Sequence, residues 1–189
     1  MLCTTMIVDM CDSGLHTPAM GTPRITLTTI GYEAATLLDF IASLRAANVS
    51  RLIDVRELAI SRRPGFAKKA LSAALEEAGI DYVHLRGLGD PKEGRAAARA
   101  GDDARFRRVF AIHMRTEAAQ TDLKKAAALV AEGGACLMCF ERDHTGCHRS
   151  IVAAAISATV QATILHLGVR TGRARHNSQG VRELVEERA

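Results

Sequence analysis

The sequence predicts a single three-layer α/β domain, with a mostly parallel five-stranded sheet and helices on both faces. Short apolar segments alternate with longer segments of helical periodicity, and the connections between them are short. Neighbouring parallel strands need helical crossovers, so this order favours a parallel sheet covered by helices. The 189 residues suffice for one such domain with a hydrophobic core. We expect residues 24–170 to form it, between tails at 1–23 and 171–189.

Five segments have the composition of strands. The first, RITLTTIGYE, is rich in Thr and Ile and ends near Gly31. The second, SRLIDVRE, has a short apolar stretch, and the third, DYVHLRGLG, ends in glycines. The fourth and fifth are ACLMCFE and ATILHLG. Their ranges are 24–33, 50–57, 81–89, 135–141 and 162–168.

The segments between these strands are predicted to be helices, except for two loops. Apolar residues recur at close to 3.6-residue spacing in 34–49, and the segments 67–80 and 148–160 are also predicted as helices. Residues 104–133 are predicted as a helix that breaks near 115–118. The turn signal Pro64–Gly65 places 58–66 in a loop, and the polar stretch DPKEGRAAARAGDD at 90–103 is predicted as a second loop.

Charge and cysteine content restrict the function classes. The formal net charge of +4 is compatible with an anionic ligand but too small to establish nucleic-acid binding. The five cysteines do not form a secreted disulfide pattern, and Asp9 and Asp12 argue against a signal peptide. The longest apolar run, 150–168, contains Ser, Thr, Gln and His, so we expect no membrane span and a cytoplasmic protein.

Polar side chains gather where the predicted strands end. Tyr32 follows the first strand, and Asp54 and Arg56 close the second, ahead of a loop that carries Ser61 and Arg62. The fourth strand ends with Cys139 and Glu141. Ligands bind outside the carboxyl ends of the strands in open parallel sheets. We therefore predict a site at this edge, with Tyr32, Arg56, Ser61 and Arg62 binding the ligand.

The stretch CFERDHTGCHRS, residues 139–150, joins the fourth strand to the last predicted helix. Cys147 and Arg149 fall at the start of that helix, where free backbone N–H groups favour negative charge. Such a position lowers a thiol pKa and can hold an anion. We predict Cys147 as a reactive nucleophile and Arg149 as an anion contact, with Asp54 or Glu141 transferring protons.

Four stretches resemble the domain of unknown function 488 (DUF488) family: TIGYE, LIDVRELAISRRPGF, GIDYVHLRGLG and LMCFERDHTGCHRSIVA. The resemblance covers about residues 26–170 and implies a compact α/β domain without a settled activity. It places these residues at shared motif positions: Asp54, Arg56, Ser61, Arg62, Cys139, Glu141, Cys147, His148 and Arg149. Tyr32 and Glu33 stand where the family often has His and Ser, which removes one candidate general base.

Three functions are therefore considered. The first is an enzyme that acts on a phosphate-bearing or nucleotide-like anion. The second is a nucleotide- or nucleic-acid-binding module that uses Arg56, Arg62, Arg63, Lys68 and Lys69, although aromatic residues for base stacking are few. The third is a metal-binding protein that uses Cys139, Cys147 and a histidine. Their spacing is not that of a zinc finger, so no metal site is predicted. The sequence identifies no cofactor and no oligomeric state.

Overall fold

A five-stranded, fully parallel sheet forms the centre of the molecule. The structure, a computed structural model, describes residues 25–172, 174–176 and 182–184. The strand order is β3-β2-β4-β1-β5, and every pairing in this sheet is parallel. The strands are β1 (Thr26–Gly31), β2 (Arg51–Asp54), β3 (Asp81–His84), β4 (Ala135–Cys139) and β5 (Thr163–Leu167). The three-layer α/β fold is confirmed.

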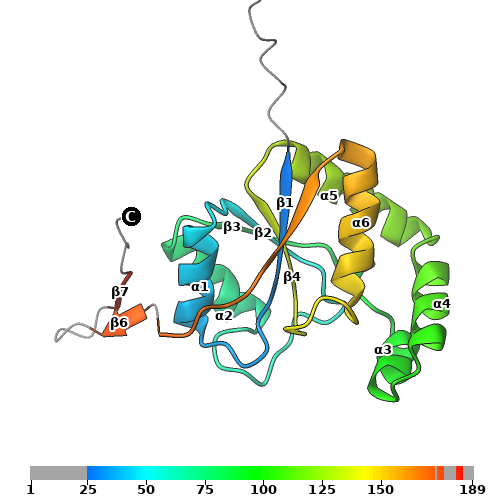
Figure 1. The fold of residues 1–189 in the computed structure, drawn as a ribbon, viewed down its shortest axis with the longest axis horizontal. Coiled ribbons are helices and arrows are strands. Elements are labelled where there is room, and N and C mark those ends of the chain that lie inside the picture. The colour runs from blue at the N-terminus through cyan, green and yellow to red at the C-terminus, as the bar shows by residue number, and fades with distance from the viewer. Residues whose placement is uncertain (1–24, 173, 177–181, 185–189) are drawn as a thin grey trace, which may run out of the picture.

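Helices cover both faces of this sheet (Figure 1). On one side lie α1 (Leu37–Ala46) and α2 (Lys68–Glu77), and on the other lie α5 (Glu117–Ala131) and α6 (His148–Val160). Farther from the sheet, beyond α6 in the view of Figure 1, α3 (Lys92–Arg99) and α4 (Asp103–His113) pack against each other. Because the strands are parallel, their carboxyl ends all lie at one edge of the sheet, between the two helical layers.

Alternation along the strands produces one core on each face of the sheet. In β2, Leu52 packs with the α1 and α2 side, whereas Ile53 packs with the α5 and α6 side. In β4, Cys136 and Cys139 likewise belong to opposite cores. Successive strand residues point to opposite faces, which accounts for this division. All five residues of β4 are buried, as expected for the central strand of a covered parallel sheet.

The region between β3 and β4 contains one correction and one confirmation. The polar stretch 90–103, predicted as a loop, contains helix α3. Its alanines are strong helix formers, and its polar character arises because only Gly94 and Ala97 are buried. The predicted break near 115–118 is confirmed, since α4 ends at His113 and α5 begins at Glu117 with Thr116 accepting a bond from the Ala119 amide.

The two ends of the chain differ in what the structure describes. The predicted N-terminal tail, 1–23, lies outside the described residues. In the predicted C-terminal tail, β6 (Ala174–His176) pairs antiparallel with β7 (Arg182–Leu184), where we expected a loop and a helical turn. These three-residue strands are too short for their sequence pattern to be recognised.

No helix in the described part of the chain is both long and apolar enough to cross a bilayer.

Candidate functional site

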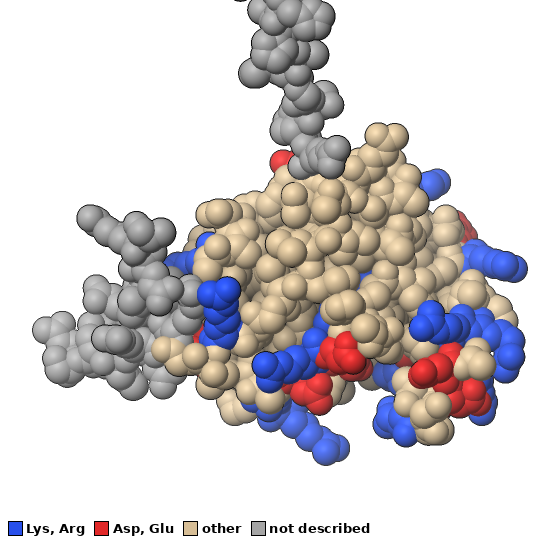
Figure 2. All heavy atoms as spheres, viewed as in Figure 1, with Lys and Arg blue, Asp and Glu red and all other residues tan. Residues whose placement is uncertain are grey.

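A cavity of about 600 Å³ opens at the carboxyl edge of the sheet. Its wall comes from the ends of β1, β2 and β4, from the loop 57–63, from α3 with Asp90 two residues ahead of it, and from the first residue of α6. Figure 2 shows charged side chains gathered along this lower edge, whereas the upper part of the same face is mostly uncharged. The arginines that line the cavity are Arg56, Arg62, Arg63, Arg95 and Arg99, and the acids are Glu57, Asp90 and Glu141. A cavity rich in arginines therefore lies at the edge of the sheet where the sequence predicted a site.

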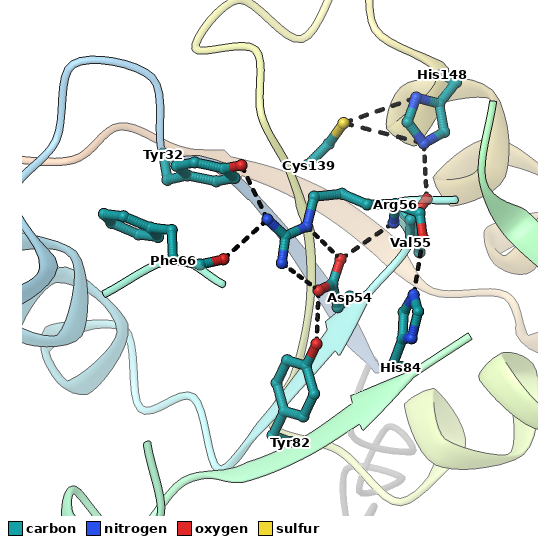
Figure 3. Close-up of polar contacts among 9 residues, drawn as sticks. All are labelled: Tyr32, Asp54, Val55, Arg56, Phe66, Tyr82, His84, Cys139 and His148. Atoms are coloured by element: carbon teal, nitrogen blue, oxygen red, sulfur yellow. Dashed lines mark hydrogen bonds and ion pairs between the residues drawn. The ribbon is translucent and has the colours of Figure 1, made fainter. Parts of the chain in front are cut away.

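A buried ion pair lies beside the cavity (Figure 3). Arg56 donates from Nε to Asp54 Oδ1 at 2.8 Å and from Nη2 to Asp54 Oδ2 at 2.6 Å. Asp54 is 0% exposed, and Tyr82 donates its hydroxyl proton to the same carboxylate. Burial alone would lower the pKa of Arg56, but its bonds and charge interaction with Asp54 raise it instead. Arg56 thus keeps its charge inside the protein.

The remaining bonds of Arg56 show that it supports the cavity wall. Its Nη1 donates to the Tyr32 hydroxyl at 2.9 Å and to the Phe66 carbonyl at 3.0 Å. The ring of Tyr32 stacks on that of Phe66 with centroids 4.4 Å apart. Four of the five guanidinium N–H groups are therefore engaged within the protein. Arg56 and Tyr32 line the cavity as predicted, but Arg56 has one N–H left for a ligand.

The loop after β2 supplies the predicted Ser61 and Arg62 to the cavity. Ser61 accepts a bond from the Arg63 amide, and Arg63 donates to the Ala35 carbonyl at 2.6 Å. Arg62 is exposed and, among the described residues, has no hydrogen bond or ion pair. Arg99, from α3, is likewise exposed and unpaired within that set. These two guanidinium groups are free to bind a ligand.

Two thiols, an imidazole and a carboxylate meet beside the cavity. Cys139 ends β4, Cys147 precedes α6, and His148 is the first residue of that helix. Both thiols donate to Glu141 Oε2, at 2.9 Å from Cys139 and 3.0 Å from Cys147. The four ligand atoms all lie within 4.8 Å of one another, which would let this group hold a metal ion. Cys139, Glu141 and His148 line the cavity.

Cys147 occupies the predicted helix start but not the predicted electrostatic environment. A hydrogen bond with Cys139, together with burial, raises the pKa of the Cys147 thiol. The thiol is 3% exposed and is absent from the cavity wall. The expected lowering of its pKa by the helix N-terminus is therefore wrong. Loss of solvent and the neighbouring sulfur outweigh the backbone N–H groups.

Arg149 and Asp54 also lie outside the cavity wall. Arg149 is 1% exposed, and its guanidinium donates to the carbonyls of Glu141 and Arg142, so it fastens the loop after β4. Asp54 is covered by Arg56 and Tyr82. Asp54 and Arg149 thus do not share the cavity wall with Ser61, Arg62 and Glu141, with which we had grouped them.

Asp90 is a cavity residue that the sequence analysis did not select. It is 6% exposed, and its Oδ1 has no hydrogen-bond partner among the described residues. Burial raises the pKa of Asp90 to about 6. A signal was present, because Asp90 directly follows the glycine-rich end of the third predicted strand. The rule that selected Asp54 and Glu141 at strand ends also applies to it.

We expect Asp90→Asn to stabilise the protein at neutral pH. The folded-state pKa of about 6 lies above the ordinary aspartate value of 3.8, so the folded protein holds the proton more tightly. Asp90 therefore costs stability as pH rises from about 4 to about 6, and the full cost of about 2–3 kcal/mol persists above pH 6. Urea unfolding should show the Asn variant equal to wild type near pH 4 and more stable by that amount at pH 7. If the two proteins differed in free energy of unfolding by the same amount at both pH values, the raised pKa of Asp90 would be contradicted.

Comparison with known proteins agrees with the motifs in the sequence. The family model described as "Domain of unknown function DUF488" matches residues 36–156. This range includes β2, β3 and β4 and every cavity residue except Tyr32. No curated protein and no solved structure matches the chain. The match therefore identifies the family without supplying an activity.

Proposed function

The chain belongs to the DUF488 family, and we propose that it is an enzyme acting on a small phosphate-bearing or nucleotide-like anion bound in the carboxyl-edge cavity. The observation that carries this proposal is the pair of unpaired arginines, Arg62 and Arg99, on the cavity wall. Guanidinium groups form bidentate, charge-assisted bonds with phosphate oxygens.

The charges around the cavity leave positive groups available. Asp54 neutralises Arg56, and Glu57 pairs with Arg95. Arg63 is held by a backbone carbonyl, which does not neutralise it. The positive charges of Arg62, Arg63 and Arg99 therefore face only the carboxyl groups of Asp90 and Glu141. Near pH 6, where Asp90 is partly protonated, the balance favours an anionic ligand further.

Two carboxyl groups in the wall could transfer protons. Asp90 lines the cavity, and its pKa of about 6 suits proton transfer near neutral pH. Glu141 lies on the wall with Cys139 and His148. We assign the proton transfer to Asp90 and Glu141 in place of Asp54, whose two oxygens are occupied by Arg56 and Tyr82.

Arg62→Ala and Arg99→Ala should each weaken anion binding by about 10- to 100-fold, because a charge-assisted hydrogen bond contributes roughly 1.5–3 kcal/mol. Titration calorimetry with inorganic phosphate and with a nucleoside monophosphate would measure this loss. Arg108→Ala is the matched control. Arg108 is exposed on α4 and does not line the cavity, and its replacement removes the same charge. It should leave affinity nearly unchanged.

Equal losses in all three variants would mean diffuse electrostatic attraction and would overturn the proposal. A short single-stranded oligonucleotide serves as the third ligand. If it binds far more tightly than the mononucleotide, and the arginine variants weaken it equally, the binding-module alternative replaces the enzyme.

A further inference from the structure

We propose that Cys139, Glu141, Cys147 and His148 form a Zn²⁺ site. Each residue offers one ligand atom, and the four atoms lie within 4.8 Å of one another. Thiolate, imidazole and carboxylate are the three side-chain ligand types that zinc uses in proteins. The inference does not depend on the anion proposal, because it concerns how these four side chains meet and not what enters the cavity.

Two of the distances among the four ligand atoms are close to those of a tetrahedral zinc site. Zinc–ligand bonds of about 2.0–2.3 Å place neighbouring ligand atoms about 3.3–3.8 Å apart in a tetrahedron. His148 Nδ1 lies 3.7 Å from Cys139 Sγ and 3.9 Å from Cys147 Sγ. The sulfur–oxygen distances of 2.9 and 3.0 Å are shorter, since thiol protons bridge these atoms. Replacing two protons with one metal ion would move Glu141 outward and bring the other ligand atoms to a shared centre, within a cluster that already spans no more than 4.8 Å.

A backbone contact orients His148 for metal binding. Its Nε2 lies 2.8 Å from the Val55 carbonyl oxygen (Figure 3). A carbonyl can only accept, so Nε2 carries the proton, and in the neutral ring Nδ1 keeps the lone pair. Cys139 Sγ lies nearly equidistant from the two ring nitrogens, 3.7 Å from Nδ1 and 3.9 Å from Nε2, so ion binding requires the sulfur or the ring to shift until Nδ1 points at the shared centre. Metal-bound histidines commonly donate their second nitrogen to such an acceptor, which fixes the tautomer. Val55 directly follows β2, so the sheet itself sets the ring orientation.

The chain between the ligands is held in place without a metal. Arg149 donates to the carbonyls of Glu141 and Arg142, which anchors the loop between Cys139 and Cys147. The amide of Cys147 donates to the His144 carbonyl, and Ser150 Oγ donates to that same carbonyl. The buried Arg149 thus acquires a role: it positions the ligands. A pre-formed arrangement of this kind reduces the ordering cost of binding an ion.

The cluster would have two states, which differ in their protons: a metal-free state with protonated thiols and a metal-bound state with thiolates. In the metal-free protein each thiol keeps its proton and donates it to Glu141. Zn²⁺ binding would release both thiol protons, and the two thiolates and the carboxylate would then coordinate the ion. The same Glu141 oxygen that now accepts two protons becomes a metal ligand. No oxidant or reductant is needed for this exchange.

The location of the cluster suggests what the ion would do. Cys139, Glu141 and His148 line the cavity, and Glu141 is the one exposed ligand. A carboxylate that faces solvent is the ligand most easily displaced, and catalytic zinc sites keep one position for water or substrate. If the proposed function holds, the ion would meet the bound anion at the position of Glu141 and polarise it; this last step alone rests on that function.

The test uses the full-length protein, reduced and stripped of metal with a chelator, and titrated with Zn²⁺ or Co²⁺ in the absence of any anionic ligand. We expect one ion per chain, a rise in the thermal midpoint with Zn²⁺, and thiolate-to-cobalt charge-transfer absorption with Co²⁺. Cys147→Ser and His148→Gln should each lower affinity by at least about 100-fold, since even outer contacts of metal ligands account for 10- to 100-fold.

Two controls make the result decisive. Cys136→Ser changes a buried cysteine of the same strand, on the opposite core, and should bind zinc as wild type does. The double variant Cys3→Ser/Cys11→Ser should also bind normally. Glu141→Gln keeps the shape of the exposed ligand, so this variant still tests the site if Cys147→Ser does not fold. It should weaken zinc binding by about 10- to 100-fold.

Wild-type protein that shows no cobalt–thiolate band, or a Cys136 variant that loses as much affinity as the Cys147 variant, would overturn the zinc site. These readouts contain no anion, and the phosphate titrations of Arg62 and Arg99 variants can be made on the metal-free protein. Failure of the zinc site and failure of the anion proposal are therefore distinguishable.

Discussion

Asp54→Ala should lower the free energy of unfolding by about 3–5 kcal/mol, the range for removing one partner of a buried ion pair. Arg56 would keep its charge in a nearly solvent-free site, because its Nε and Nη2 donors would lose the Asp54 carboxylate. Tyr82 would lose the acceptor for its hydroxyl proton as well. Urea unfolding at pH 7 measures the change directly.

Asp81→Ala provides the matched control. Asp81 pairs with Arg51 at 3.3 Å, but its side chain is 70% exposed, and exposed pairs contribute about 0–1 kcal/mol. A second test replaces both charged partners, as Asp54→Leu with Arg56→Met. Because no buried charge is then left unpaired, this double variant should be more stable than Asp54→Ala. Equal stability of the two would mean that the lost packing, and not the orphaned charge, causes the effect.

The fold and the place of the site could be predicted because both follow from patterns along the chain. Alternating strands and amphipathic helices require a parallel sheet, and a parallel sheet brings all its carboxyl ends to one edge. Asp54 and Cys139 close neighbouring strands, β2 and β4, so they had to lie near each other. Ser61, Arg62 and Glu141 follow those strand ends and line the cavity as expected.

The roles of Cys147 and Arg149 could not be predicted in the same way, since they depend on which partners the side chains meet. Position at a helix start indicates free N–H groups, but not that a second thiol and a dry environment surround the sulfur. The guanidinium of Arg149 donates to backbone carbonyls of its own loop, so these donors are not available to a ligand. Both outcomes depend on how the side chains of residues 139–150 pack. No periodic pattern in that stretch of the sequence predicts this packing.

The cavity residues from α3 were missed for a different reason. Residues 90–103 were predicted as a loop, and a loop gives no reason to expect that its charged residues share one face. Once the segment is a helix, Arg95 and Arg99 are four residues apart, so they lie on one face, and both reach the cavity. Helix propensity of the alanines was the available signal, and the polar composition obscured it.

Gly31→Ala should be destabilising by about 3 kcal/mol, the upper end of the usual range for overpacking, because it overpacks a contact between two backbones. Gly31 ends β1 opposite Cys139 of β4, and past this point Tyr32 and Glu33 donate to the carbonyls of Cys139 and Phe140. A β-carbon on Gly31 would lie 1.8 Å from the Glu141 carbonyl oxygen. That oxygen also accepts from Arg149, so the loop cannot withdraw without losing that bond.

Gly146→Ala is the control in the same loop. A β-carbon there meets no atom within 4 Å, and Gly146 is not among the glycines with positive φ, so its cost should stay within about 0.5 kcal/mol. Thermal and urea unfolding of both variants would compare them. Because Gly31→Ala pushes on Glu141, whatever folded protein remains should also bind Zn²⁺ more weakly, whereas Gly146→Ala should bind it as wild type does. A Gly31 variant of wild-type stability would mean that β1 and the Glu141 carbonyl do not approach this closely, and that the cluster beside them has a different shape.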